Sequence, residues 1–154
     1  MVFTLKLQPM TAESAEFYMD YACNGENAGF DLFMPREVRF APGERKFVNL
    51  EVKALVCSES KEQNFWMVPR SSISKTGLMM MNSVGVIDKS YRGDLIAALW
   101  NTTDKEVVIQ HGHRLVQIVG PTMESFHSVE VVNSVKSIDE KTSRGTGGFG
   151  STGL

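Results

Sequence analysis

The sequence predicts an all-β domain built as a jelly-roll-like antiparallel β-barrel, and three observations lead to this prediction. Polar and apolar residues alternate in many short segments, which is the pattern of strands that bury one face. Turn residues such as Ala41-Pro42-Gly43-Glu44 separate these segments at short intervals. The chain has 154 residues, of which 42% are hydrophobic and 22% charged, and these values suit one globular domain.

The individual elements follow from their patterns in chain order. A strand is expected over residues 3–7, where apolar and polar side chains alternate, and helical signals are confined to 12–21 and a short turn near 72–76. One half-buried strand is expected over 46–56, because its apolar side chains share one parity. The remaining strand candidates are 65–68, 95–100, 106–109, 115–119 and 129–135.

Composition and charge exclude several classes of protein. The net charge of -2, from 16 basic and 18 acidic side chains without a basic cluster, does not suit a protein that binds nucleic acid. No apolar run approaches the ~20 residues of a membrane helix, and the N-terminus lacks the pattern of a secretory signal. The two cysteines, Cys23 and Cys57, suit a reducing compartment. We therefore expect an intracellular protein, cytoplasmic or nuclear, or inside a host cell if its origin is viral.

The last eleven residues, 144–154, differ in composition from the domain expected over 1–143. They hold five of the chain's thirteen glycines and a single aromatic ring. Such a segment cannot bury enough surface to order itself, so we expect a mobile C-terminal arm. Glycine backbone, an arginine and the serine and threonine hydroxyl groups of this segment are also well suited to bind a phosphate group.

Four further segments combine charged, hydroxyl and amide side chains in ways that folding does not by itself explain. Each alone has a structural interpretation: an acid in a turn after glycine, a helix cap, a hairpin turn, or polar residues on the outer face of a strand. The segments are 28–33 (AGFDLF), 69–78 (PRSSISKTGL), 82–95 (NSVGVIDKSYRGDL) and 112–119 (GHRLVQIV).

Together with RGTGGFGSTG at 144–153, and in this order and spacing, these segments resemble the five motifs of the trimeric all-β dUTPases, the deoxyuridine triphosphate nucleotidohydrolases. The resemblance spans nearly the whole chain, and the third and fifth motifs are its most specific parts. One departure is His113, because the family usually has an acid before the arginine that here is Arg114. The resemblance implies the β-barrel of the dUTPase type and a homotrimer.

The resemblance also implies an activity, which is hydrolysis of dUTP to dUMP and pyrophosphate. This reaction keeps uracil out of DNA and supplies dUMP for thymidylate synthesis. Asp88 matches the acid that holds and deprotonates the water attacking the α-phosphorus, and a carboxylate ionised at neutral pH can accept that proton. Mg²⁺ is the implied cofactor, and Asp31 would meet its hydration shell through water.

The other implied site residues are assigned by their positions in the motifs. Those that would contact uracil and deoxyribose are Asn82, Gly85, Tyr91, Ile96 and Phe149. Those that would contact the phosphates are Arg70, Ser71, Ser72, Gln117, Arg144, Gly150, Ser151 and Thr152. The implied partners are dUTP and two further copies of the chain, with sites shared between chains and the arm supplied by the third. No nucleic acid and no membrane is expected as a partner.

Three alternatives are weighed against this interpretation. A deaminase of the same fold would release ammonia from dCTP, but the complete arm motif and Tyr91 favour a dUTPase. A sensor that binds dUTP without turnover would not need Asp88. A protein that binds single-stranded nucleic acid through the arm would be expected to carry clustered basic charge, which the sequence lacks.

Overall fold

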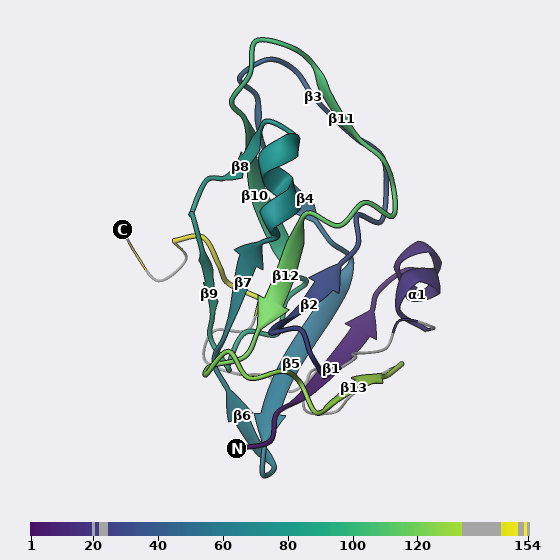
Figure 1. Ribbon diagram of the computed structural model, residues 1–154, viewed down its shortest axis with the longest axis vertical. Coiled ribbons are helices and arrows are strands. Elements are labelled where there is room, and N and C mark those ends of the chain that lie inside the picture. The colour runs from purple at the N-terminus through teal and green to yellow at the C-terminus, as the bar shows by residue number, and fades with distance from the viewer. Residues whose placement is uncertain (20, 22–24, 134–145, 151–152, 154) are drawn as a thin grey trace.

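Strands make up most of the regular secondary structure, as the alternating pattern predicts (Figure 1). The computed structural model describes residues 1–19, 21, 25–133, 146–150 and 153. Within these residues one α-helix, α1 (Ala12–Tyr18), and one 3-10 helix (Ser71–Lys75) accompany the strands. The all-β class is therefore confirmed. The strands are β1 (Thr4–Pro9), β2 (Gly29–Leu32), β3 (Val38–Phe40), β4 (Arg45–Asn49), β5 (Val52–Ser58), β6 (Lys61–Gln63), β7 (Phe65–Pro69), β8 (Leu78–Met80), β9 (Gly85–Ile87), β10 (Ile96–Asn101), β11 (Val107–Ile109), β12 (Val116–Val119) and β13 (Ser128–Val131).

The described strands pair into four sheets. One sheet has the order β13-β1-β5-β6, and another has the order β2-β12-β7-β9. A three-stranded sheet has the order β4-β10-β8, and β3 pairs with β11 at the upper end of the molecule in Figure 1. Most of these pairings are antiparallel, whereas β1 and β13 run parallel. Many neighbouring strands come from distant parts of the chain, as in a jelly roll and unlike a simple meander.

One hydrophobic core lies between the sheets. Leu5 of β1, Met67 of β7, Leu99 of β10 and Ile118 of β12 belong to a single buried cluster, and each is at most 1% exposed. Burial of a side chain of this size contributes about 1.5–3 kcal/mol. The strands that carry or adjoin the polar motifs are therefore anchored in the same core.

The strand expected over 46–56 consists of two strands, so this prediction is wrong in one respect. β4 pairs with β10 and β5 pairs with β1, which means that the chain passes from one sheet to another at Glu51. Glu51 has a φ of 58°, in the left-handed region, and its backbone N–H donates to Asn49 Oδ1 at 2.7 Å. The bend leaves no trace in the alternation, because Val48 and Val52 on either side of it are both buried.

The helix α1 is shorter than expected and ends at Tyr18 instead of residue 21. It begins with a capping box in which Thr11 and Ser14 satisfy each other's backbone N–H groups. At its end the hydroxyl of Tyr18 accepts a hydrogen bond from Phe33 N at 3.0 Å. Burial raises the pKa of Tyr18 to about 12, although the hydrogen bond from Phe33 acts in the opposite direction. The hydroxyl is therefore neutral and fixes α1 against the segment after β2.

Two further expectations concern the boundary between the domain and the arm and the absence of a membrane-spanning helix. The boundary between 143 and 144 lies outside the described residues, so the division into domain and arm stays a prediction. In the part of the chain that the structure describes, no helix combines the length and hydropathy that a bilayer crossing requires.

Candidate active site

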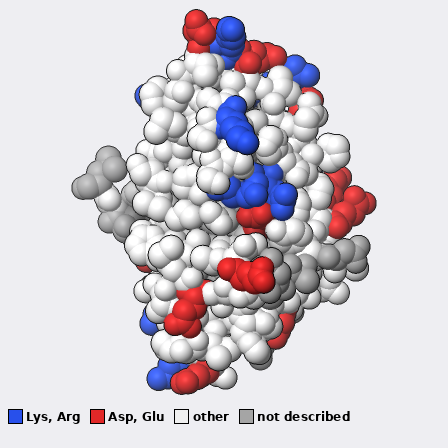
Figure 2. All heavy atoms as spheres, viewed as in Figure 1, with Lys and Arg blue, Asp and Glu red and all other residues white. Residues whose placement is uncertain are grey.

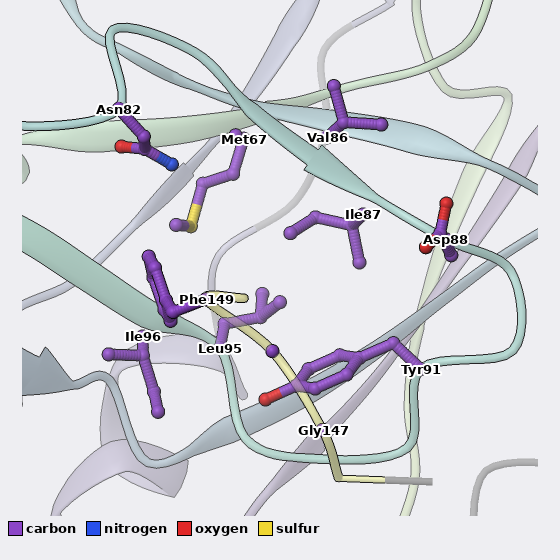
Figure 3. Close-up of a pocket in the computed structure, with 12 residues that line it drawn as sticks. Met67, Asn82, Val86, Ile87, Asp88, Tyr91, Leu95, Ile96, Gly147 and Phe149 are labelled. Atoms are coloured by element: carbon purple, nitrogen blue, oxygen red, sulfur yellow. The ribbon is translucent and has the colours of Figure 1, made fainter. Parts of the chain in front are cut away.

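A cavity of about 260 Å³ lies between β9, the start of β10 and the described part of the arm (Figure 3). It brings together all six of the predicted residues that would hold the nucleoside and the attacking water. The predicted residues in its wall are Asn82, Gly85, Asp88, Tyr91, Ile96 and Phe149, and the others are Met67, Val86, Ile87, Leu95, Gly147 and Gly148. We call it the nucleoside cavity.

Tight backbone packing shapes the Asn82 end of this cavity. A Cβ atom on Gly85 would lie 3.1 Å from the backbone oxygen of Met67, so glycine lets β9 run close against β7. Ser83 has a φ of 61°, and Val84 N donates to Asn82 O at 2.6 Å. Asn82 and Asp88 lie at opposite ends of β9 in Figure 3, with the Ile87 side chain between them. The cavity therefore offers an amide at one end and a carboxylate at the other.

The loop between Asp88 and Ile96, which joins β9 to β10, is fixed by Tyr91. The Tyr91 hydroxyl donates to the backbone oxygen of Asp94 at 2.6 Å. Burial raises the pKa of Tyr91, and the negative charge of Asp94 adds to the shift, so the hydroxyl keeps the proton that this bond needs. A Cβ atom on Gly93 would overlap the Tyr91 ring, which explains why the turn has glycine there.

Arg92 also anchors this loop, and it was not among the predicted site residues. Arg92 is 5% exposed, and its Nη2 donates to both carboxylate oxygens of Glu62 at 2.9 Å. Its Nη1 donates to the backbone oxygen of Lys89 at 2.6 Å, inside the turn between Asp88 and Tyr91. The charge-assisted contact to Glu62 and the bond to Lys89 together hold the Arg92 side chain against the loop. The sequence did show an arginine in a motif whose other residues are explained by substrate contacts. It could not show that this arginine anchors the loop, because its partner Glu62 is 30 residues away in the sequence.

A second cavity, of about 360 Å³, lies where β2, β12 and the end of β7 meet. It brings together four of the predicted residues that would serve the phosphates and the metal ion. Those four are Asp31, Arg70, Ser71 and Gln117, and the rest of the wall is Glu26, Asn27, Ala28 and Gly29. We call it the charged cavity.

Strand register explains why Asp31 and Gln117 lie together. They are direct cross-strand partners in β2 and β12, and Gln117 Nε2 donates to the backbone oxygen of Pro69 at 3.3 Å. A Cβ atom on Gly29 would overlap the Gln117 side chain. Gly29 therefore makes room for a polar side chain in the cavity wall, a role that the sequence did not reveal.

Two arginines hold the carboxylate of Asp31. Arg70 Nε lies 3.0 Å from Asp31 Oδ1, and Arg114 Nη1 donates to Asp31 Oδ2 at 3.0 Å. The hydroxyl of Tyr21 donates to the same Oδ2 at 3.2 Å. Arg70 Nη1 also donates to Ser72 Oγ at 3.2 Å, which places the predicted Ser72 in this network. Arg70 and Arg114 together balance the charges of Asp31 and of Glu26, which also lies in the wall, and guanidinium N–H groups can also donate to a bound anion.

Figure 2 shows basic side chains gathered on this face where β12 begins, next to an acidic side chain. The contacts of Arg114 run to Asp31 and Tyr21. The substitution of His113 for the family's usual acid therefore leaves Arg114 with a carboxylate partner.

The donor set of the charged cavity fits a hydrated cation better than a directly bound one. Both oxygens of Asp31 are already engaged by arginines. Among the described residues, no three His, Cys, Asp or Glu side chains form a cluster that could hold a metal ion. A hard cation such as Mg²⁺ keeps several waters and uses phosphate oxygens as ligands, so contact with Asp31 through water is compatible with this arrangement.

The remaining predicted residues belong to the arm. Gly150 is described, has a φ of 91°, and accepts a hydrogen bond at its backbone oxygen from Gly153 N at 3.0 Å. Arg144, Ser151 and Thr152 lie outside the described residues. Gly147, Gly148 and Phe149 line the nucleoside cavity of their own chain, so the arm does find contacts on the domain that carries it. Donation of the arm to another chain stays a prediction.

Comparisons with known proteins show what this chain resembles. The dUTPase family model matches residues 21–153. The deoxyuridine 5'-triphosphate nucleotidohydrolase of Lactococcus lactis is 40% identical over 134 residues, which cover 82% of each protein. The dUTPase structure from Streptococcus mutans aligns with a TM-score of 0.61 and 29% identity over 74% of this chain and 92% of that chain.

A more distant solved structure has the same fold. It is a mutant dUTPase from phage phi11 of S. aureus, described with a structural Mg(II) ion, and it aligns with a TM-score of 0.59. The alignment covers 75% of this chain and 88% of that chain at 20% identity. At this identity the likeness shows the fold alone.

Proposed function

The chain belongs to the dUTPase family and is a dUTP diphosphatase, and from this premise we propose that it hydrolyses dUTP to dUMP and pyrophosphate with Asp88 as the base. The observation that supports the proposal most strongly is that one cavity unites Asp88 with every residue expected to hold the nucleoside. In a cell this reaction would keep uracil out of DNA and supply dUMP for thymidylate synthesis.

The nucleoside would lie with its base at the Asn82 end of the cavity and its α-phosphate near Asp88. Asn82 and the backbone of β9 and β10, including Gly85 and Ile96, offer donors and acceptors that can distinguish uracil from cytosine. The tight loop between Asp88 and Ile96 would leave no room for the methyl group of thymine. The ring of Tyr91 would lie against the deoxyribose and exclude a ribose 2′-hydroxyl, because a buried hydroxyl without a partner is costly.

The chemical step would use the carboxylate of Asp88 as the proton acceptor. A water oxygen forms a new bond to the α-phosphorus while the bond from that phosphorus to the bridging α–β oxygen breaks. The electron pair leaves with pyrophosphate, and the proton of the water passes to Asp88. Phe149 would stack on the uracil ring and exclude bulk water from the cavity.

The triphosphate would be held by the charged cavity together with the arm. Arg70, Ser71, Ser72 and Gln117 carry donors on one side, and the arm would add Arg144, Gly150, Ser151 and Thr152. Bound Mg²⁺ would neutralise part of the phosphate charge and restrict the phosphate chain. Asp31, oriented by its two arginines, would accept hydrogen bonds from water in the shell of that ion.

The two cavities share no wall residue, which suits a site assembled from several chains. In the proposed homotrimer the nucleoside cavity of one chain would face the charged cavity of its neighbour, and the arm would come from the third chain. Each trimer would then hold three equivalent sites.

The experiment that tests this function is a pyrophosphate-release assay across dUTP, dCTP, dTTP and UTP, with and without Mg²⁺. We expect release from dUTP in strong preference to the other three, and a large loss of rate when EDTA removes the metal. Ammonia from dCTP would identify a deaminase instead. Binding of dUTP by the purified protein without any pyrophosphate release would overturn the proposal in favour of a sensor.

A further inference from the structure

Phe47 and Phe149 form an aromatic pair beside the nucleoside cavity, and Phe47 belongs to none of the five motifs. Phe47 lies on β4 and is 64% exposed, and Phe149 is 52% exposed. Their ring centroids are 5.0 Å apart and their planes cross at 67°, an edge-to-face arrangement. Adjacent aromatic rings that remain this exposed are uncommon on a soluble domain unless they serve a contact.

The register of the sheet places Phe47 next to the cavity without making it part of the wall. Phe47 is the cross-strand partner of Ala98 in β10. Ile96, two residues before Ala98 and therefore on the same face of β10, lines the cavity. Phe149 both lines the cavity and contacts Phe47, so it links the cavity to the outer face of β4.

The backbone of the arm turns sharply at this contact. Phe149 has a φ of 49°, and the next residue, Gly150, has a φ of 91°. A side chain larger than glycine is disfavoured at positive φ, so tertiary contacts must hold Phe149 in this conformation. The ring of Phe47 supplies such a contact.

We propose that Phe47 is a positioning residue, which docks Phe149 over the nucleoside cavity and thereby sets how tightly the arm holds the base. This inference rests on the proposed function, in which Phe149 stacks on uracil. Since Phe47 lies outside the cavity wall, it would act through Phe149 and would affect binding of the nucleotide more than the chemical step. It would act in the same way on an arm from its own chain or from a neighbour.

A double-mutant cycle tests the coupling between the two rings. Phe47→Ala should raise the KM for dUTP about three- to tenfold, the value expected for one edge-to-face pair, with kcat nearly unchanged. Phe47→Tyr, which keeps the ring, should restore the KM. In a Phe149→Ala background, Phe47→Ala should have no further effect. Met79→Ala is the matched control, because Met79 is 55% exposed on β8 of the same sheet.

A second readout does not depend on catalysis. Limited trypsin digestion after Lys141 or Arg144 would remove the arm, and Phe47→Ala should accelerate its loss while Met79→Ala should not. If the wild-type chain releases no pyrophosphate from dUTP, the proposed function fails and the digestion still tests the docking. Additive effects of Phe47→Ala and Phe149→Ala on KM, or equal digestion rates for Phe47→Ala and the wild-type chain, would overturn the inference.

Discussion

The two cavities are built by different means although both lie along β7. The nucleoside cavity is formed by close backbone approaches at Gly85 and Gly93 and by apolar side chains. The charged cavity is formed by two arginines that converge on Asp31. Shape and fixed backbone groups discriminate between similar bases and sugars, whereas charge binds any polyphosphate and weakens with salt. The comparison suggests that selectivity resides in the first cavity and phosphate affinity in the second.

The largest effect is expected from Asp88→Asn in the nucleoside cavity. The substitution keeps the shape of the side chain and removes the proton acceptor, so kcat should fall about 10²- to 10⁴-fold. Binding of a non-hydrolysable dUTP analogue, measured by calorimetry, should change little. A near-normal kcat would show that the base lies elsewhere.

The next largest effect is expected from Arg70→Gln in the charged cavity. This change removes one of the two guanidinium groups on Asp31 and the contact to Ser72. Charge-assisted hydrogen bonds contribute about 1.5–3 kcal/mol, so kcat/KM for dUTP should fall about 10- to 100-fold. The salt dependence of KM should also become shallower.

Arg39→Gln is the control for that measurement, because Arg39 is 59% exposed and pairs with the exposed carboxylates of Glu37 and Glu106, far from both cavity walls. It should leave kcat/KM unchanged. If Arg70→Gln altered the preference for dUTP over dTTP more than the KM, the division of labour between the cavities would be wrong.

A smaller effect is expected from Tyr91→Phe, which tests selectivity in the nucleoside cavity. The variant loses the hydrogen bond from the hydroxyl to Asp94 O, which is worth about 1 kcal/mol. The loop between Asp88 and Ile96 should therefore loosen. The ratio of kcat/KM for dUTP to that for UTP should fall about fivefold. An unchanged ratio, measured with both substrates in competition, would show that the hydrogen bond from Tyr91 to Asp94 does not contribute to the discrimination of the sugar.

The smallest effect is expected at a charged pair that belongs to neither cavity. Arg36 donates to both carboxylate oxygens of Glu51, at 2.7 and 2.8 Å. Burial alone would raise the pKa of Glu51, but hydrogen bonds from Arg36 and Thr11 and the charge of Arg36 outweigh it, so the pKa is lowered. A lowered pKa means that the pair stabilises the fold above the ordinary glutamate range, and that this contribution disappears as the pH falls through the folded-state value.

Glu51→Gln should therefore reduce the midpoint of urea unfolding slightly at pH 7, and the reduction should become smaller as the pH is lowered below the ordinary glutamate range, with dUTP turnover at pH 7 unchanged. A loss of turnover at pH 7 would mean that the bend between β4 and β5 contributes to the nucleoside cavity.

Motif positions could be predicted from the sequence, whereas the contacts that hold them could not. Asp88 and Tyr91 stand in a short segment whose residue types suggest chemistry. Arg92 lies in the loop between β9 and β10, and Glu62 lies on β6, 30 residues earlier in the sequence, so no local pattern connects them. Phe47 resembles any residue on the outer face of a strand until the arm is placed against it.

The strands illustrate the same limit. Alternation and runs of apolar, β-prone residues predicted β1, β7, β10 and β12 with nearly correct bounds, because each of these strands has four to six residues. Strands β3, β6, β8 and β9 have three residues each and are too short for a period of two to stand out. The equally short β11 was predicted because its three residues are all β-branched. The change of sheet at Glu51 depends on which strands pair, which is a property of the whole fold.

The most direct test of the account is complementation between the two cavities. Asp88→Asn chains and Arg70→Gln chains, each with low activity alone, are mixed under conditions that allow subunits to exchange, and exchange is verified by co-purification of two different tags. If each site combines the nucleoside cavity of one chain with the charged cavity of another, about one site in four should be intact in a random mixture. We predict that the mixture regains a corresponding fraction of wild-type pyrophosphate release. With exchange verified, activity no greater than the mean of the two parents would contradict the account and place both cavities of a site on one chain.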